Sequence, residues 1–252
     1  MEATSTGPNR TGATINPAAL SQMLEAAQQH PPQASAGPSL MDVERQRYIN
    51  ESESVGSIPA PRSLAKSTTA RIKGFTGART LGVLLDKHGE RIAFERAGTR
   101  LYDALITKCA ALVDDGGLPA DAGNANVLAT LARMRNQELE HFQMLTRCVE
   151  QLGGDPTAQT PCADVIGAAS IGLLQVVSDP RTTLAQSLNA VLTAELTDNA
   201  GWELLTELAE LAGQDQFQSS FVEALAVEEE HLEIVRAWLR TLVTDATGTP
   251  AV

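Results

Sequence analysis

Four long segments of this 252-residue chain place apolar residues at alternating steps of three and four. This spacing puts the apolar side chains on one face of an α-helix, which then buries that face against other helices. The four segments are residues 86–114, 122–152, 182–212 and 215–244. Aromatic residues make up only 4% of the chain, and β-branched residues do not gather in alternating runs as they do in strands. The pattern predicts an all-α fold, an antiparallel four-helix bundle.

Glycine and proline mark the ends of these helices. Residues 114–119 stop the first helix, residues 153–156 stop the second, and Gly213 separates the last two. Two connections are short, so the helices they join should be antiparallel neighbours. The middle connection, about residues 153–181, is long enough to cross the bundle. Its apolar part, residues 162–177, is expected to form a short helix along this crossover.

Residues 1–63 are rich in Pro, Ser, Thr, Gln and Asn and have too few apolar residues to offset chain entropy by burial. We expect a flexible N-terminal arm, in which only residues 17–29 and 40–49 have helical patterns. The rest of the chain is then expected to form a linker, the bundle and a C-terminal tail, at residues 64–81, 82–246 and 247–252.

Acidic residues outnumber basic ones, with 31 Asp and Glu against 19 Lys and Arg. The net charge of -12 would repel a nucleic-acid backbone or an anionic membrane, so we expect no nucleic-acid and no membrane partner. The three cysteines form no CxxC pair, and no run approaches the roughly 18 uninterrupted apolar residues of a membrane helix. Together these features predict a cytoplasmic protein.

Glutamates and histidines interrupt all four apolar faces at one level. The second and fourth helices each carry Glu-x-x-His in the middle of the apolar face, and the first and third each carry a glutamate there. The six residues are Glu95, Glu138, His141, Glu195, Glu228 and His231. Each first- or third-helix glutamate is followed seven residues later by an aromatic residue, Tyr102 or Trp202. The two halves therefore look like a duplicated two-helix unit.

Four buried carboxylates at one level need compensating charge. Burying an unpaired charge is costly, and clustered like charges raise one another's pKa until they protonate. We expect no lysine or arginine on these faces near that level. Two divalent cations would cancel the four charges, and carboxylate and imidazole ligands suit iron or manganese. In Glu-x-x-His both side chains share one helical face, so the histidine can hold one ion while the glutamate reaches a second. We therefore predict a dimetal site.

The order of these residues resembles the ferritin-like dimetal-carboxylate superfamily: a glutamate, Glu-x-x-His, a long connection, a second glutamate and a second Glu-x-x-His. The resemblance covers about residues 82–244. Tyr102 and the turn LGGDPT at residues 152–157 make rubrerythrin-like members the most similar. It implies that Glu138 and Glu228 bridge two iron ions. It further implies that Glu95 and Glu195 are terminal ligands and that His141 and His231 each bind one ion.

This resemblance also implies an activity, namely a peroxidase- or ferroxidase-type oxidoreductase that reacts its iron with hydrogen peroxide or O2 in oxidative stress or iron handling. Rubrerythrins carry a rubredoxin domain with paired CxxC motifs for electron delivery, which this sequence lacks, so the electron donor is left open. We also expect a homo-oligomer, a dimer or larger.

Three alternatives stay open. One is a dimanganese catalase holding two manganese ions, although the equal ligand sets of the two halves favour iron. Another is an iron-storage or shell-packaged ferritin-like protein whose N-terminal arm is a docking element. The third is oxygenase chemistry on an organic molecule, which requires a substrate cavity.

Two residues near the glutamates are candidates for a catalytic role. Asp198 follows the third-helix glutamate by one turn, where the first helix has Gly98. It is either an extra ligand that moves onto a metal or an acceptor that orients a histidine N–H. Tyr102 either donates a hydrogen bond to a ligand, passes electrons or fills the core. Gly98 either leaves space for oxygen or peroxide or allows close helix packing. His30 has no expected function, and His88 is expected to cap or flank the first helix.

Overall fold

The computed structural model describes residues 17–30, 38–53, 74–114 and 124–245. All regular structure within these ranges is helical, and none of their residues forms a strand. The all-α prediction is therefore confirmed. The chain divides into two units, residues 1–55 and 56–252.

The described part of the first unit consists of two helices. Helix α1 spans Pro17–Gln29 and α2 spans Pro38–Glu51. Proline opens each helix, where its fixed φ suits the first turn and its missing N–H is not needed. No residue of α1 is buried. Both helices fall where the pattern predicts them, whereas the rest of the expected arm, and the expected C-terminal tail, lie outside the described residues.

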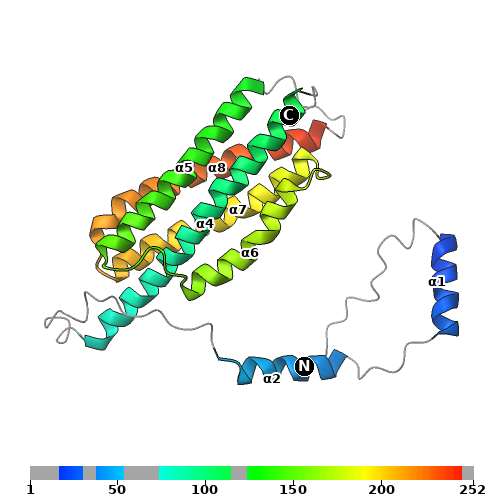
Figure 1. Cartoon of the computed structure of the whole chain (residues 1–252), viewed down its shortest axis with the longest axis horizontal. Coiled ribbons are helices and arrows are strands. Elements are labelled where there is room, and N and C mark those ends of the chain that lie inside the picture. The colour runs from blue at the N-terminus through cyan, green and yellow to red at the C-terminus, as the bar shows by residue number, and fades with distance from the viewer. Residues whose placement is uncertain (1–16, 31–37, 54–73, 115–123, 246–252) are drawn as a thin grey trace. The chain divides into compact units, whose positions relative to one another are not determined.

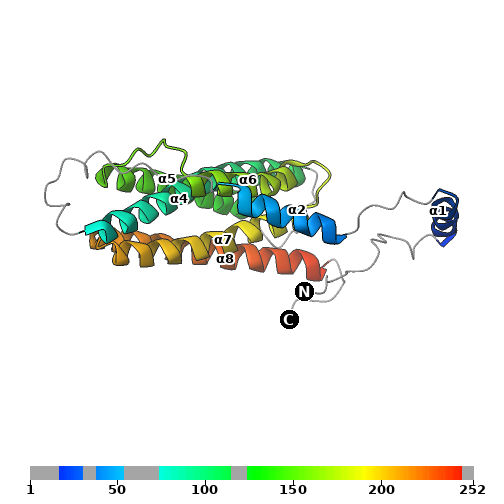
Figure 2. The same ribbon diagram turned by 90° about the horizontal axis from the view of Figure 1, so that it is seen from below.

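Five α-helices make up the described part of the second unit (Figure 1). They are α4 (Gly74–Asp114), α5 (Asn124–Gln151), α6 (Pro161–Ser178), α7 (Leu184–Leu211) and α8 (Gln218–Asp245), with a short 3-10 turn, η2 (Asp215–Phe217), before α8. Helix α4 packs against α5, α6 and α7, and α7 also packs against α6 and α8. The turned view shows the same helices lying side by side (Figure 2).

The faces predicted to be apolar are the buried ones. Leu131, Met134 and Leu145 of α5 are fully buried, and each such side chain contributes about 1.5–3 kcal/mol through its removal from water. Two apolar clusters result. One includes Leu105 and Leu131, and the other includes Leu84 and Leu145. The predicted level of glutamates and histidines lies between these clusters along the helices.

Glycines end two of the helices, as predicted. Gly153 follows α5 with a φ of 76°, and Gly213 follows α7 with a φ of 65°. In both places the next residue donates its N–H to a carbonyl at the end of the helix, at 2.9 Å. This is the geometry in which a left-handed residue closes a helix, and only glycine adopts it without a steric cost. The predicted stop after the first long helix lies outside the described residues.

Helix α4 begins earlier than predicted. Its first residue is Gly74, so residues 74–81 of the expected linker are helical. Extending an existing helix costs little compared with nucleating one, and no proline interrupts this stretch. The helix therefore continues beyond its buried half, which is the part that the apolar spacing reveals.

Helix α6 is the one helix among the described residues that is long and apolar enough to cross a membrane by length and composition alone. Its mean hydropathy is 1.5, and 17% of it is buried. The core helix of a folded body passes the same test, and α6 packs against both α4 and α7. The absence of a membrane partner stays a prediction.

His88 neither caps nor flanks a helix, contrary to the prediction. It lies inside α4, fully buried, with its ring edge-on to those of Phe217 and Phe221. Its Nδ1 donates to the carbonyl of Leu84 at 2.8 Å, since a carbonyl can only accept. Burial lowers the pKa of His88 to about 4, so the ring is neutral near pH 7.

Replacing His88 with phenylalanine should reduce the loss of stability in acid. Between the ordinary pKa of 6.5 and the folded value of about 4, the unfolded chain binds a proton that the folded chain does not. The free energy of unfolding of the wild type should therefore fall, relative to the variant, by up to about 3 kcal/mol as the pH drops through this range. Urea denaturation of both proteins across this range measures the difference. Equal losses in the two proteins would contradict a neutral, buried His88.

Candidate metal centre

The structure brings all six predicted metal ligands together in the interior of the second unit. Helices α4, α5, α7 and α8 present them from the middle of their buried faces, and none is more than 8% exposed. They are Glu95, Glu138, His141, Glu195, Glu228 and His231. The protein is therefore helical with a buried cluster of acidic and histidine side chains that could bind metal.

The ligand atoms fall into groups that share Glu228. Within each group, one ligand atom from every residue lies within 4.8 Å of the others. The first group is Glu138, Glu195, Glu228 and His231, and the second is Glu95, His141 and Glu228. A further group joins Asp198 to Glu95, Glu138 and Glu228. Oxygen and imidazole donors at this spacing suit first-row divalent metals.

Each histidine aims its Nδ1 at carboxylates of the cluster. His141 Nδ1 lies 2.6 Å from Glu228 Oε1 and 3.7 Å from Glu95 Oε2. His231 Nδ1 lies 3.1 Å from Glu228 Oε2 and 3.4 Å from Glu138 Oε1. The step of three residues from Glu228 to His231 places both side chains on one face of α8. The two imidazoles thus approach the same central carboxylate from different helices.

Several of these buried atoms have no hydrogen-bond partner. They include Glu95 Oε2, Glu195 Oε2, both carboxylate oxygens of Glu228, and Nδ1 of both histidines. The short approach of His141 Nδ1 to Glu228 Oε1 lacks the alignment of a hydrogen bond. Leaving a buried polar atom unpaired costs about 1–3 kcal/mol, so such atoms are rare in folded proteins. A cation bound among these converging lone pairs would satisfy them, so this donor set could hold metal.

The ring of His231 is oriented by Gln137, which the sequence pattern does not reveal. His231 Nε2 lies 2.9 Å from Gln137 Oε1, and Arg133 Nη1 donates to the same oxygen at 3.1 Å. Because a guanidinium only donates, this atom is the acceptor, and Nε2 must carry a proton. Nδ1 is then the nitrogen that binds a metal or titrates. Gln137 is only partly buried, so no apolar periodicity marks it.

The clustered groups shift one another's pKa values. Burial, reinforced by the charge of Glu228, raises the pKa of Glu138 well above its ordinary value and that of Glu195 to about 8. Burial opposes the charging of His141 and His231, but the nearby carboxylates outweigh it and raise the pKa of each to about 10. For Glu228 burial is likewise outweighed, here by the two imidazoles, which lower its pKa to about 2. At neutral pH the cluster therefore carries protons that metal ions would displace.

A buried arginine lies at this level, contrary to the prediction that none would. Arg91, 2% exposed, stands one turn before Glu95 on α4. Its Nη2 donates to Glu95 Oε1 at 2.6 Å and contacts Asp198 Oδ1, and its guanidinium lies 4.7 Å from the centre of the Phe94 ring. Asp198 is thus held by Arg91, and no histidine N–H of the described residues donates to it. Since the charges of Arg91 and Asp198 cancel, no arginine charge is left over for the four glutamates, which must be balanced by protons or by metal ions.

The two aromatic residues next to the cluster differ in role. Tyr102 Oη donates to Glu195 Oε1 at 2.5 Å, which corresponds to the first of its three expected roles. Burial, reinforced by the charge of Glu195, raises the pKa of Tyr102 well above its ordinary value, so it stays a donor. Trp202 is fully buried, and its ring packs edge-on to His141 at 5.4 Å. Its Nε1 has no hydrogen-bond partner in the described part of the chain, which fits a packing role.

Gly98 makes room for the side chain of Glu138. A Cβ built at this position would collide with Glu138 Oε2, so the space beside the glycine is taken up by a carboxylate. Of the two expected roles for Gly98, the structure therefore shows close packing, because Glu138 of α5 lies against the α4 backbone at this glycine. Gly201 is similar, since a Cβ there would collide with the guanidinium of Arg91.

No family model, curated protein or solved structure matches this chain. The chemistry of the centre is therefore inferred from its residues and their geometry.

Replacing Gly98 with alanine should weaken metal binding, because the added methyl group displaces the Glu138 carboxylate. Alanine also favours the helix by about 1 kcal/mol, so the variant should stay folded. We expect a loss of affinity of about 10- to 100-fold, as when the support of a metal ligand is removed. Calorimetric titration of the metal-free protein with Mn²⁺, or anaerobically with Fe²⁺, measures this change.

The matched control is Gly82→Ala on the same helix, where a Cβ meets no atom within 4 Å. It brings the same gain in helix propensity and should leave the affinity unchanged. Indistinguishable affinities for the two variants would show that Gly98 is not needed to seat Glu138.

Metal binding should release protons and should tighten as the pH rises. Glu138 and Glu195 have raised carboxyl pKa values, and both imidazoles titrate near 10, so a metal at neutral pH competes with protons on these groups. The apparent affinity should increase as the pH rises from 6 through the Glu195 value of about 8. Titrations in buffers of different ionisation enthalpy count the released protons. Binding without proton release would be inconsistent with this cluster as the site.

Proposed function

We propose that this protein is a ferritin-like dimetal-carboxylate protein that holds two iron ions in its buried cluster. In this proposal α4, α5, α7 and α8 are the antiparallel four-helix bundle, and the segment containing α6 is its long crossover. The described helices support it because each of these four contributes a glutamate at one level, and α5 and α8 add a histidine three residues later.

One observation carries the proposal: the unbalanced charge of the cluster. Four buried glutamates converge in a region where Arg91, the one buried arginine among the described residues, is already balanced by Asp198. Two divalent ions would bring the total to zero and would satisfy the unpaired oxygen and nitrogen atoms. A purely structural polar cluster would be expected to have these atoms joined in hydrogen bonds.

The groups of ligand atoms support a particular assignment. Glu228 belongs to both groups, as a bridging ligand would. One ion would then be held by Glu95 and His141, and the other by Glu195 and His231. Glu138 would be the second bridge. It belongs to the group of Glu195 and His231, and it also joins Glu95 in the group that includes Asp198.

The proposed activity is the reduction of hydrogen peroxide or O2. Two ferrous ions would supply two electrons, which together with two protons convert hydrogen peroxide into two water molecules. The protein contributes the positions of the ligands. Tyr102 fixes one oxygen of Glu195, Gln137 fixes the ring of His231, and the apolar clusters on either side keep bulk water away.

Metal content tests the proposal directly. Protein purified without added metal should contain about two iron ions per chain and, when oxidised, should absorb visible light as a coupled ferric pair does. Glu138→Ala and His231→Ala should each abolish this stoichiometry, because each removes a buried ligand. Elemental analysis and the absorption spectrum measure the outcome.

The matched controls are Glu140→Ala and Glu229→Ala, which remove exposed glutamates one or two positions from a ligand on the same helices. They should bind metal normally, and equal behaviour of all four variants would contradict the site. Manganese in place of iron, with rapid O2 evolution from hydrogen peroxide, would instead support a dimanganese catalase.

A further inference from the structure

A buried guanidinium lies at the edge of the candidate metal centre. Arg91 Nη2 donates to Glu95 Oε1 at 2.6 Å and contacts Asp198 Oδ1, so one nitrogen joins two carboxylates from different helices. Both carboxylates also belong to the group of ligand atoms that includes Glu138 and Glu228. The guanidinium therefore competes with a metal ion for two members of this group.

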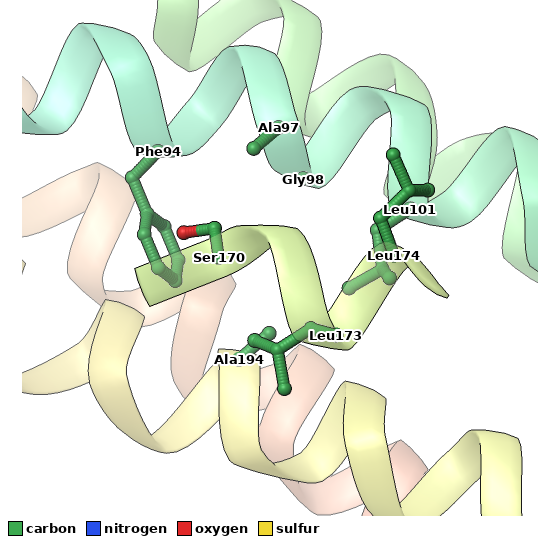
Figure 3. Close-up of a pocket in the computed structure, with 8 residues that line it drawn as sticks. All are labelled: Phe94, Ala97, Gly98, Leu101, Ser170, Leu173, Leu174 and Ala194. Atoms are coloured by element: carbon green, nitrogen blue, oxygen red, sulfur yellow. The ribbon is translucent and has the colours of Figure 1, made fainter. Parts of the chain in front are cut away.

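The surroundings of this guanidinium suit an arginine. A Cβ built on Gly201 of α7 would collide with Arg91 Nη1, so this glycine leaves room for the side chain. The guanidinium also stands over the Phe94 ring in a cation–π contact, 4.7 Å from its centre. Figure 3 shows this ring extending from α4 toward Ser170 of α6. A planar fork is able to lie on the ring and reach both carboxylates, whereas a lysine ammonium is a point charge.

Arg91 limits how Glu95 is able to bind a metal. With Oε1 of Glu95 held, only Oε2 is left unpaired. Glu195 is arranged in the same way, since Tyr102 donates to its Oε1 and its Oε2 is unpaired. Each of these glutamates therefore directs one oxygen into the cluster, although a carboxylate is able to bind an ion through both. The two donors differ in charge, because the tyrosine is neutral and the guanidinium is a cation.

Charge gives Asp198 a role distinct from that of the four glutamates. Asp198 and these glutamates are five buried carboxylates, and two divalent ions would cancel only four of their charges. Arg91 supplies the remaining positive charge, and it does so in contact with Asp198. Distance alone does not keep Asp198 from a metal, because it lies within the same 4.8 Å group as Glu95, Glu138 and Glu228.

We propose that Arg91 is a positioning residue that keeps Asp198 out of the ligand set and so limits the centre to two ions and six ligands. This inference rests on the proposed function. It makes Arg91 a cation that opposes metal binding, so its removal should tighten the binding of metal. A residue that merely supported Glu95 would have the opposite effect, because losing the support of a ligand weakens binding.

The variant Arg91→Met removes the charge and keeps a side chain of similar length. In calorimetric titrations of the metal-free, full-length protein with Mn²⁺, we expect it to bind about tenfold more tightly than the wild type, because Asp198 and both oxygens of Glu95 become available. Asp198→Asn leaves Arg91 without its partner and should weaken binding by a similar factor. The double variant Arg91→Met/Asp198→Asn removes both charges and should return the affinity to within about threefold of the wild type.

The matched control is Arg96→Met, which removes an exposed arginine next to Glu95 on the same helix. Because solvent screens its charge, the affinity should not change. A weaker or unchanged affinity of Arg91→Met would overturn the proposal. Should this variant fail to fold because Asp198 is left buried without a partner, the other two variants decide it. Equal affinities of Asp198→Asn and the double variant would show that the charge of Arg91 does not act on the metals.

A crystal structure of the Mn²⁺-loaded protein provides a second readout, since anomalous scattering locates the ions. In the wild type we expect two ions, with Asp198 against Arg91 and away from both ions, whereas in Arg91→Met we expect Asp198 to bind one of them. Asp198 bound to an ion in the wild type would overturn this inference and leave the proposed function intact. A wild type that takes up no metal at this cluster would contradict the proposed function, and this inference with it.

Discussion

The charge of four buried glutamates is the constraint to which the surrounding structure responds. Desolvation and mutual repulsion both oppose their ionisation, and the only buried guanidinium among the described residues at this level is shared between Glu95 and Asp198. Two outcomes lower the energy: protons, which the raised pKa values of Glu138 and Glu195 already indicate, or cations. In a cluster balanced by protons alone, the buried oxygen and nitrogen atoms would be expected to form hydrogen bonds with one another. Several of these atoms have no partner and point at one another, which favours a cation-binding site.

Packing makes this concentration of charge possible. The apolar clusters on both sides of the polar level keep water away and hold the helices in a fixed register, so the ligands need no further ordering when an ion arrives. Glycines provide room where two large polar groups must approach a helix backbone: Gly98 for Glu138, and Gly201 for Arg91. Hydrogen bonds from Tyr102 and to Gln137 then fix individual ligand atoms.

The sequence was sufficient to locate the buried face of each bundle helix and the polar ligands on it. Spacing within a helix locates the buried faces, and glutamates on those faces are conspicuous because such residues are seldom buried. Contacts between helices could not be predicted from the spacing within one helix. Arg91 stands on the buried face of α4 at a step of four from Glu95, but its burial makes sense only once Asp198 of α7 is known to meet it. Gln137 lies off the buried face and acts by reaching His231 on α8. His88 was misplaced because the start of α4 lies beyond the apolar pattern.

The match between the two halves breaks down at this arginine. If Glu95 of α4 corresponds to Glu195 of α7, then Arg91 corresponds to Val191, and Asp198 corresponds to Gly98. Each half thus has one charge that the other lacks, the two charges have opposite signs, and they touch. Losing both would leave the total charge of the interior as it is, whereas losing either would strand its companion in a dry environment. We therefore expect Arg91 and Asp198 to be retained together or lost together in related sequences.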